Sequence, residues 1–260
     1  MNYYNEYDTK TAAWLRELIR ADLIPDGDVD ERSITEVAPR DLRGYTQCHF
    51  FAGIGGWSLA LQLAGWPSDR PVWTGSCPCQ PFSVAGKGRG TADERHLWPV
   101  FFNLLKECRP EYVFGEQVAS AIGHGWLDGI SADLEAENYA CGAAVLGAHS
   151  FKSPHRRQRL YWVADDRGRL VLSDCDGCSA GSPAATPAGY GNTIEPAGFW
   201  NDSQLVHCRD GKARRIPTEP AFFPLAHGIP ARVVRLRGYG NAIVPQVAAE
   251  FVSAFLECMS

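Results

Sequence analysis

Short apolar runs alternate with amphipathic, helix-like segments through the first 165 residues of this 260-residue chain. Residues 9–21 place Ala13, Leu15, Leu18 and Ile19 on one side at helical spacing. Tyr112–Phe114, in contrast, is a short continuous run typical of a buried strand. Strands that alternate with helices form a mainly parallel sheet with helices on both faces. We therefore predict an α/β fold with this sheet at its centre.

The remaining elements are predicted from the same two patterns. Further strands are expected at 47–52, 71–75, 143–149 and 160–164. Further helices are expected at 57–64, 97–108, 130–137 and 246–257. The strand at 112–114 is expected to end at Gly115-Glu116, which puts Glu116 at the carboxyl edge of the sheet, where α/β proteins bind ligands.

The regular alternation is interrupted after Asp166. Residues 173–220 are rich in Gly, Pro, Ser, Ala and Asn with little periodicity, and regularity resumes at Ala231. We predict an α/β domain over 1–172, a small irregular insert over 173–230, and a segment over 231–260 that returns to the domain. Composition alone fits a recognition surface and a plain surface excursion equally well.

Charge is divided unevenly between the two parts of the chain. The net charge of −5 includes 12 basic and 20 acidic residues over 1–150, against 13 basic and 8 acidic residues over 151–240. Of the 25 basic residues, 20 are arginine, whose guanidinium suits bidentate contacts to phosphate and guanine. The basic later part therefore indicates a polyanionic partner, although the average charge is acidic.

The nine cysteines have no regular spacing and do not indicate the disulfide framework of a small secreted protein. The polar start and the lack of an apolar run of roughly 20 residues predict neither a leader nor a membrane span, so a cytoplasmic protein is expected. Cys175 and Cys178 form one C-x-x-C pair, with His207-Cys208 downstream. Free thiols are expected here rather than a zinc site, because the second half of the set is adjacent rather than spaced.

The most specific motif is Pro78-Cys79-Gln80-Pro81-Phe82-Ser83. Two prolines that bracket a cysteine fix the backbone and deny it ladder hydrogen bonds, which presents the thiol in a stiff loop. Such a loop suits a nucleophile, although a lone cysteine is more often a buried structural residue. The motif by itself leaves both interpretations open.

This motif is one of five sequence blocks whose fixed order resembles that of a known protein family. They are FAGIGGWSLAL at 51–61, PCQPFS at 78–83, GEQV at 115–118, PHRRQRLYWVA at 154–164 and GYGNAIVPQVA at 238–248. Together they resemble the DNA cytosine-5 methyltransferases, from residue 48 to the C-terminus with the insert excepted. The resemblance implies a Rossmann-like sheet that binds S-adenosylmethionine (SAM), with 173–230 as a target-recognition lobe. It also implies a monomeric enzyme of bacterial or phage restriction-modification type, with double-stranded DNA as its partner.

The chemistry that the resemblance implies fits the residue types. Carbon 5 of cytosine is a weak nucleophile, so the Cys79 thiolate adds to carbon 6, and the resulting enamine takes the methyl group. By resemblance Glu116 is the acid near N3, Arg159 holds the cytosine O2, and Arg157 braces the nucleophile loop. The plain alternatives are a surface carboxylate and two phosphate-contacting arginines. The base can be reached only after it is flipped out of the duplex.

The resemblance also implies a cofactor site and a loop that faces DNA. The glycine-rich turn receives the methionine end of SAM, with Phe51 against the adenine. The cofactor contacts expected in this part of the chain are Phe51, Gly53, Gly55, Gly56, Pro78 and Asn241. The loop at 84–95 closes over the flipped base, and the expected DNA contacts are Gln80, Ser83, Lys87, Arg89 and Arg95.

One segment of the family pattern is missing from its usual place. Only residues 57–76 separate the glycine turn from the Pro-Cys loop, where the family has two more strands that bear carboxylates for the ribose and the adenine. Residues 1–37 contain a similar segment, in which Glu6 would bind the ribose hydroxyls, Tyr7 would stack on adenine, and Asp28 would accept from the adenine amino group. The second and third strands would then precede the first. The alternative is an unrelated helical arm.

The rearranged order leaves one question open. It reverses the direction of the crossover after the first strand, and the sequence does not fix which face of the sheet its helix takes. Three smaller departures leave the nucleophile, the acid and the arginine pair untouched. Gln117 replaces an asparagine and keeps an amide, His155 replaces a glutamine, and His49 replaces an acid in the first strand.

Two other functions fit the same residues. One is cytosine modification without SAM, such as hydrolytic deamination, because addition of the thiol also opens carbon 4 to water. The other is an inactive DNA-binding homologue, which is disfavoured because Cys79, Glu116 and Arg159 are all present. The sequence does not give the recognised DNA site or a restriction partner.

Overall fold

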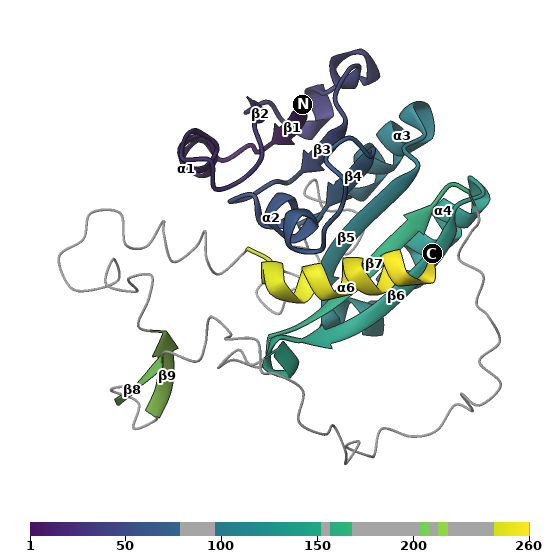
Figure 1. Ribbon diagram of the computed structural model, residues 1–260. Coiled ribbons are helices and arrows are strands. Elements are labelled where there is room, and N and C mark those ends of the chain that lie inside the picture. The colour runs from purple at the N-terminus through teal and green to yellow at the C-terminus, as the bar shows by residue number, and fades with distance from the viewer. Residues whose placement is uncertain (79–96, 152–156, 168–202, 208–212, 218–241, 260) are drawn as a thin grey trace.

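A seven-stranded sheet in the order β2-β1-β3-β4-β5-β7-β6 forms the centre of the computed structural model (Figure 1). The structure describes residues 1–78, 97–151, 157–167, 203–207, 213–217 and 242–259. The strands are β1 (Asn2–Asn5), β2 (Gly27–Asp30), β3 (Gln47–Phe50), β4 (Val72–Gly75), β5 (Tyr112–Val118), β6 (Ala140–Gly147) and β7 (Gln158–Asp165). Only the pairings of β7 with β5 and β6 are antiparallel among these strands, so the predicted mainly parallel α/β sheet is confirmed.

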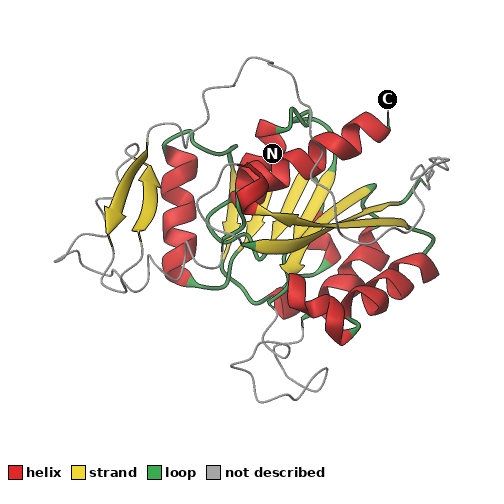
Figure 2. Ribbon diagram, turned by 90° about the horizontal axis from the view of Figure 1, so that it is seen from below, coloured by secondary structure: helices red, strands yellow, loops and turns green. Residues whose placement is uncertain are grey.

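Helices cover both faces of the sheet (Figure 2). The α-helices are α1 (Thr9–Arg20), α2 (Gly56–Leu63), α3 (Trp98–Cys108), α4 (Trp126–Ala136) and α6 (Pro245–Cys258). The short 3-10 turns are η1 (Ile34–Glu36), η2 (Pro39–Leu42), η5 (Ala119–His124) and η6 (Ala148–Phe151). The apolar sides of α2 and α6 share one core with the strands, whereas α3, α4, η1 and η2 pack into the core of the opposite face.

The strand residues divide between the two cores by simple alternation. In β5, Tyr112 and Phe114 contact the α2 and α6 side, while Val113 faces the α3 and α4 side. All three are fully buried. Gly115 follows in the same strand, and a Cβ there would lie 2.2 Å from the Trp162 ring of β7, so the indole fits only against a glycine.

The first two strands of the chain lie beside the third one in the sheet. β1 pairs with β3 on one side and with β2 on the other, so β2 is the edge strand. Residues 1–37 therefore form part of the central sheet, which excludes the unrelated helical arm. Helix α1 is capped at its N-terminus by Asp8, whose carboxylate accepts from the Lys10 and Thr11 amides at 3.1 and 2.8 Å.

The crossover from β3 through α2 to β4 has an unusual hand. Helices α1 and α2 lie on the same face, where Leu15 and Ile24 approach the start of α2 at Gly55. The β1–α1–β2 connection nevertheless runs toward the β2 edge, and β3–α2–β4 runs the other way. The two connections therefore differ in hand. The β4–α3–β5 connection, with α3 on the opposite face, shares the hand of β1–α1–β2, so β3–α2–β4 has the rare left-handed form.

Several predicted boundaries shift. β5 runs on to Val118, because β7 pairs with it as far as Arg159, so the expected end at Gly115-Glu116 was wrong and Glu116 lies within the strand. Helix α4 and strand β6 begin at Trp126 and Ala140, earlier than predicted.

A β-hairpin lies within the predicted insert. β8 (Ser203–His207) and β9 (Ala213–Pro217) pair antiparallel in a two-stranded sheet of their own, which the irregular composition did not predict. Cys175, Cys178 and Cys208 lie outside the described residues. Within the described ranges, no group of His, Cys, Asp or Glu has the arrangement of a metal site, and no helix is long and apolar enough to cross a membrane.

Candidate functional site

The predicted site residues that the structure describes gather at one edge of the sheet. This edge contains the carboxyl ends of β1, β3, β4 and β5, together with the beginning of antiparallel β7. The described residues at this edge are Glu6, Tyr7, Phe51, Gly53, Gly55, Gly56, Pro78, Glu116, Arg157 and Arg159. Asp28 is the exception, because it lies within β2, opposite Tyr3. The predicted residues that lie outside the described ranges are Cys79, Gln80, Ser83, Lys87, Arg89, Arg95 and Asn241.

The glycine turn between β3 and α2 uses its glycines for two different reasons. Gly53 and Gly55 have φ of 57° and 76°, the left-handed region that favours glycine. A Cβ on Gly55 would lie 2.7 Å from Ile24, and one on Gly56 would lie 2.8 Å from Ile243, so these two glycines allow close packing. A Cβ on Gly53 would meet no atom of the described residues within 4 Å. The turn is therefore open to a ligand at Gly53.

Glu6 lies directly against this open position. Its Oε2 accepts from the Gly53 amide and its Oε1 accepts from the Asp8 amide, both at 2.8 Å. Burial raises the pKa of Glu6, and the two amide hydrogen bonds oppose the rise. A carboxylate has about four lone-pair sites, so two remain for hydroxyl donors.

The aromatic and acidic residues predicted around adenine are not all brought together. Phe51 follows β3 with φ of 53° and packs edge-on against Phe101 at 6.2 Å. Tyr7 is 73% exposed beside Glu6, where its ring is available to a ligand. Asp28, however, accepts from the Tyr45 hydroxyl at 2.5 Å and pairs in β2 with Tyr3, three residues before Glu6. The structure does not place Asp28 next to Glu6.

Two side chains bind the segment that leads from β4 into the Pro-Cys loop, one at a side chain and one at the backbone. The indole Nε1 of Trp57 in α2 donates to Ser76 Oγ at 3.0 Å. The amide Nε2 of Gln117 in β5 donates to the Cys77 carbonyl at 3.2 Å. The amide that Gln117 shares with the asparagine it replaces indicated a preserved role from the sequence. No feature of the sequence singled out Trp57. Pro78 is exposed at the last described position before Cys79.

Glu116 is a buried carboxylate beside the two predicted arginines. Its side chain projects from β5, is 8% exposed as a residue, and forms an ion pair of 2.7 Å between its Oε1 and Arg159 Nε. Burial raises the pKa of Glu116, while the charges of Arg159 and Arg157 oppose the rise. Burial therefore favours the protonated form of Glu116, and the two arginines favour its ionised form.

Arg157 connects the beginning of β7 to the segment before α6. Its Nη2 donates to the Ala242 carbonyl at 2.6 Å, next to Asn241 of the predicted cofactor set. Burial and the nearby charge of Arg159 lower the pKa of Arg157. Both arginines act electrostatically on Glu116.

The site therefore has two described parts on either side of the segment that leads to Cys79. One part combines Glu6 with the open Gly53 turn, and the other combines Glu116 with Arg157 and Arg159. The amino edge of the sheet instead carries ion pairs that tie elements together, such as Arg167 with Glu111 at 2.6 Å.

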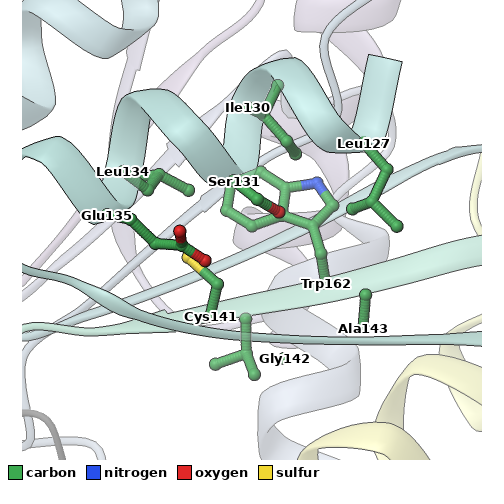
Figure 3. Close-up of a pocket in the computed structure, with 10 residues that line it drawn as sticks. Leu127, Ile130, Ser131, Leu134, Glu135, Cys141, Gly142, Ala143 and Trp162 are labelled. Atoms are coloured by element: carbon green, nitrogen blue, oxygen red, sulfur yellow. The ribbon is translucent and has the colours of Figure 1, made fainter. Parts of the chain in front are cut away.

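A small cavity lies elsewhere, between α4 and the β6–β7 pair (Figure 3). Its volume is about 90 Å³, and its wall combines Leu127, Ile130, Leu134 and the Trp162 ring with the polar residues Ser131 and Glu135. None of the predicted site residues that the structure describes lines it. Its place on the α3 and α4 face separates it from the Glu6 and Glu116 groups.

Comparison with known proteins identifies a matching family. Residues 67–173 match the family model of the C-5 cytosine-specific DNA methylases. The type II methyltransferase M.AplI of Arthrospira platensis is 35% identical over 150 residues, which cover 44% of this chain and 44% of that protein. M.HhaI of Haemophilus parahaemolyticus is 25% identical over 169 residues, or 49% of this chain and 51% of that protein. The matches thus span about half the length of these curated relatives.

A structural relative was found as well. The S. pombe Dnmt2 methyltransferase aligns with 64% of this chain and 50% of its own, with a TM-score of 0.40 and 16% sequence identity.

Proposed function

Since the chain belongs to the C-5 cytosine-specific DNA methylase family, we propose that it transfers a methyl group from SAM to carbon 5 of a flipped-out cytosine in double-stranded DNA. The observation that carries this proposal is the buried Glu116, paired with Arg159 and next to Arg157, at the strand edge beside the segment that leads to Cys79. The proposed partner is duplex DNA, and a cytoplasmic monomer is the expected form. Residues 173–230 are proposed as the target-recognition lobe.

The proposed chemistry assigns one task to each residue of the base site. The Cys79 sulfur forms a bond to carbon 6, while Glu116 gives a proton to N3, so the ring becomes a neutral enamine. Arg159 donates to the cytosine O2, and Arg157 holds the adjoining segment through Ala242. After carbon 5 gains its methyl group, carbon 5 loses its proton to water, N3 returns its proton to Glu116, and departure of the Cys79 thiolate restores the aromatic ring.

The residues at the glycine turn fit SAM, which when bound supplies an electrophilic methyl group on its sulfonium. Glu6 has two remaining acceptor positions for the ribose hydroxyls, and Gly53 leaves open space beside the turn. The exposed Tyr7 and the left-handed Phe51 are proposed as the aromatic contacts. Asp28, which also accepts from the Tyr45 hydroxyl, is proposed as the acceptor for the adenine amino group.

We also propose that β1 and β2 are the family's second and third strands, moved ahead of the first. The support is the sheet order, in which β1 lies next to β3 and β2 outside β1. Glu6 follows β1 directly and meets the glycine turn that follows β3. A cofactor site can therefore form from strands that are neighbours in space, whatever their order in the chain.

Cys79 provides the first test. Duplex DNA of mixed sequence is incubated with SAM that carries a labelled methyl group, and the label in 5-methylcytosine is measured. Cys79→Ala is expected to lower incorporation at least about 1000-fold, because the enamine forms only through the thiol adduct. Cys258→Ala changes an exposed cysteine of α6 and is the matched control. Conversion of cytosine to uracil without SAM would replace the proposal with deamination.

Glu6 provides the second test, which concerns the cofactor segment. Glu6→Ala is expected to raise the Kd for SAM about 10- to 100-fold, the usual effect of losing hydrogen bonds to a charged acceptor. Titration calorimetry measures this Kd, and DNA binding should stay as in the unchanged protein. Glu17→Ala, an exposed acid on α1, controls for charge. Unchanged SAM affinity in a folded Glu6→Ala protein would remove the cofactor role of residues 1–37.

A further inference from the structure

Trp57 directly follows the glycine turn and packs against the two strands that carry Glu116 and Arg159. It is the second residue of α2, directly after the glycine turn, and is 5% exposed. Its ring packs against Phe114 at 6.2 Å and edge-on against Tyr161 at 6.1 Å. These two residues belong to β5 and β7, the strands that carry Glu116 and Arg159.

The same indole is tied to the strand end that leads to Cys79. Its Nε1 donates to Ser76 Oγ at 3.0 Å, and Ser76 stands three residues before Cys79. A buried indole N–H needs an acceptor, but the packing of the ring does not require that the acceptor come from this segment. Trp66 shows the contrast, because its Nε1 donates to the Arg70 carbonyl, four residues along its own segment.

We propose that Trp57 is a positioning residue that links the glycine turn to the nucleophile loop through its hydrogen bond to Ser76. The inference rests on the proposed function, in which the turn binds SAM and Cys79 is the nucleophile. Gln117 holds the next carbonyl, at Cys77, from the β5 side. The indole therefore fixes the loop entry from the cofactor side, as Gln117 fixes it from the side of Glu116.

The first experiment compares single-turnover methyl transfer with SAM affinity. Trp57→Phe and Ser76→Ala are each expected to lower the transfer rate about 5-fold, the effect of one hydrogen bond, with the Kd for SAM within twofold. The double variant should be no slower than the slower single variant, since both remove one interaction. The proposal would be overturned if the rate losses of the two single variants multiplied in the double variant. It would also be overturned if either single variant transferred the methyl group as fast as the unchanged protein.

Trp66→Phe is the matched control. It makes the same chemical change in the same core, where Trp66 is also 5% exposed, but it leaves the Cys79 segment alone. It should lower stability as Trp57→Phe does and leave the transfer rate unchanged. A loss of rate in Trp66→Phe as large as in Trp57→Phe would show a general packing effect and overturn the proposal. Ser76→Ala keeps the test valid if Trp57→Phe does not fold.

A second readout separates this inference from the proposed function. S-Adenosylhomocysteine is added, and the alkylation of Cys79 by iodoacetamide is followed by mass spectrometry of the Cys79 peptide. Bound S-adenosylhomocysteine should change the rate of Cys79 alkylation in the unchanged protein. In Ser76→Ala, with the same fraction of protein bound to S-adenosylhomocysteine, this change in rate should be at least twofold smaller. If DNA is not methylated but this dependence is seen, the proposed function fails and the link stands. An equal change in both proteins overturns the link.

Discussion

Replacement of Arg159 by methionine is expected to destabilise the protein by about 3 kcal/mol at pH 8 and by much less at pH 5.5. The substitution removes the ion-pair partner of Glu116, whose carboxylate is buried in β5. Burial already raises the pKa of Glu116, and loss of the Arg159 charge raises it further. A carboxyl group whose folded-state pKa lies above its unfolded value is stabilised in the folded state by protonation. The loss of stability caused by Arg159→Met therefore becomes smaller as the pH falls.

Urea unfolding at the two pH values measures the effect. In a Glu116→Gln background the Arg159→Met penalty should shrink to about 1 kcal/mol and lose its pH dependence, because no buried charge is left unpaired. Arg20→Met, which breaks the exposed pair with Glu17, is the control and should change stability by less than about 0.5 kcal/mol. An Arg159→Met penalty of equal size at pH 5.5 and pH 8 would contradict the assignment of a buried, ionised Glu116.

Much of the sheet could be predicted because its residues carry a local signal. The run Tyr112–Phe114 is buried on both faces of the sheet, and its continuous apolar pattern predicts this burial. The segment with Glu6 was placed in the sheet through its resemblance to a strand, a helix and a second strand. The structure has these elements as β1, α1 and β2.

The parts that could not be predicted depend on contacts between distant residues. The face taken by α2 follows from its packing against α1, where Leu15 and Ile24 meet Gly55, and not from the usual hand of a crossover. The length of β5 depends on β7, which pairs Arg159 with Val118. No feature near Asp28 indicates that Tyr45 bonds to it.

The residues of the candidate site also divide into those that the sequence indicates by their type and those that only a distant contact reveals. Glycines and charged residues stood out in the sequence, because their types are unusual for a core. Trp57 did not stand out, since a tryptophan in an apolar helix is first of all a core residue. Only the contact with Ser76 gives it a further role, and that contact joins residues 19 positions apart.

His49 gives the second large expected effect, a loss of stability in mild acid. It is 1% exposed in β3, stacked on Tyr4 at 5.0 Å, with its Nδ1 at 2.9 Å from Thr74 Oγ1. Burial lowers the pKa of His49 to about 3. Between that value and the unfolded pKa of about 6.5, the unfolded chain binds a proton that the folded protein does not, so stability falls as the pH falls.

The expected loss is about 2 kcal/mol between pH 7 and pH 5, since each pH unit below 6.5 contributes about 1.4 kcal/mol. Comparison with His49→Phe isolates it, because phenylalanine keeps a ring against Tyr4 and cannot titrate. The variant has a lower stability at pH 7, where it lacks the Thr74 contact, but it should lose about 2 kcal/mol less on acidification. Equal acid losses in the two proteins, measured by urea unfolding, would mean that His49 takes up a proton within the fold. The apolar layer under α2 would then be open to water, which its packing does not allow.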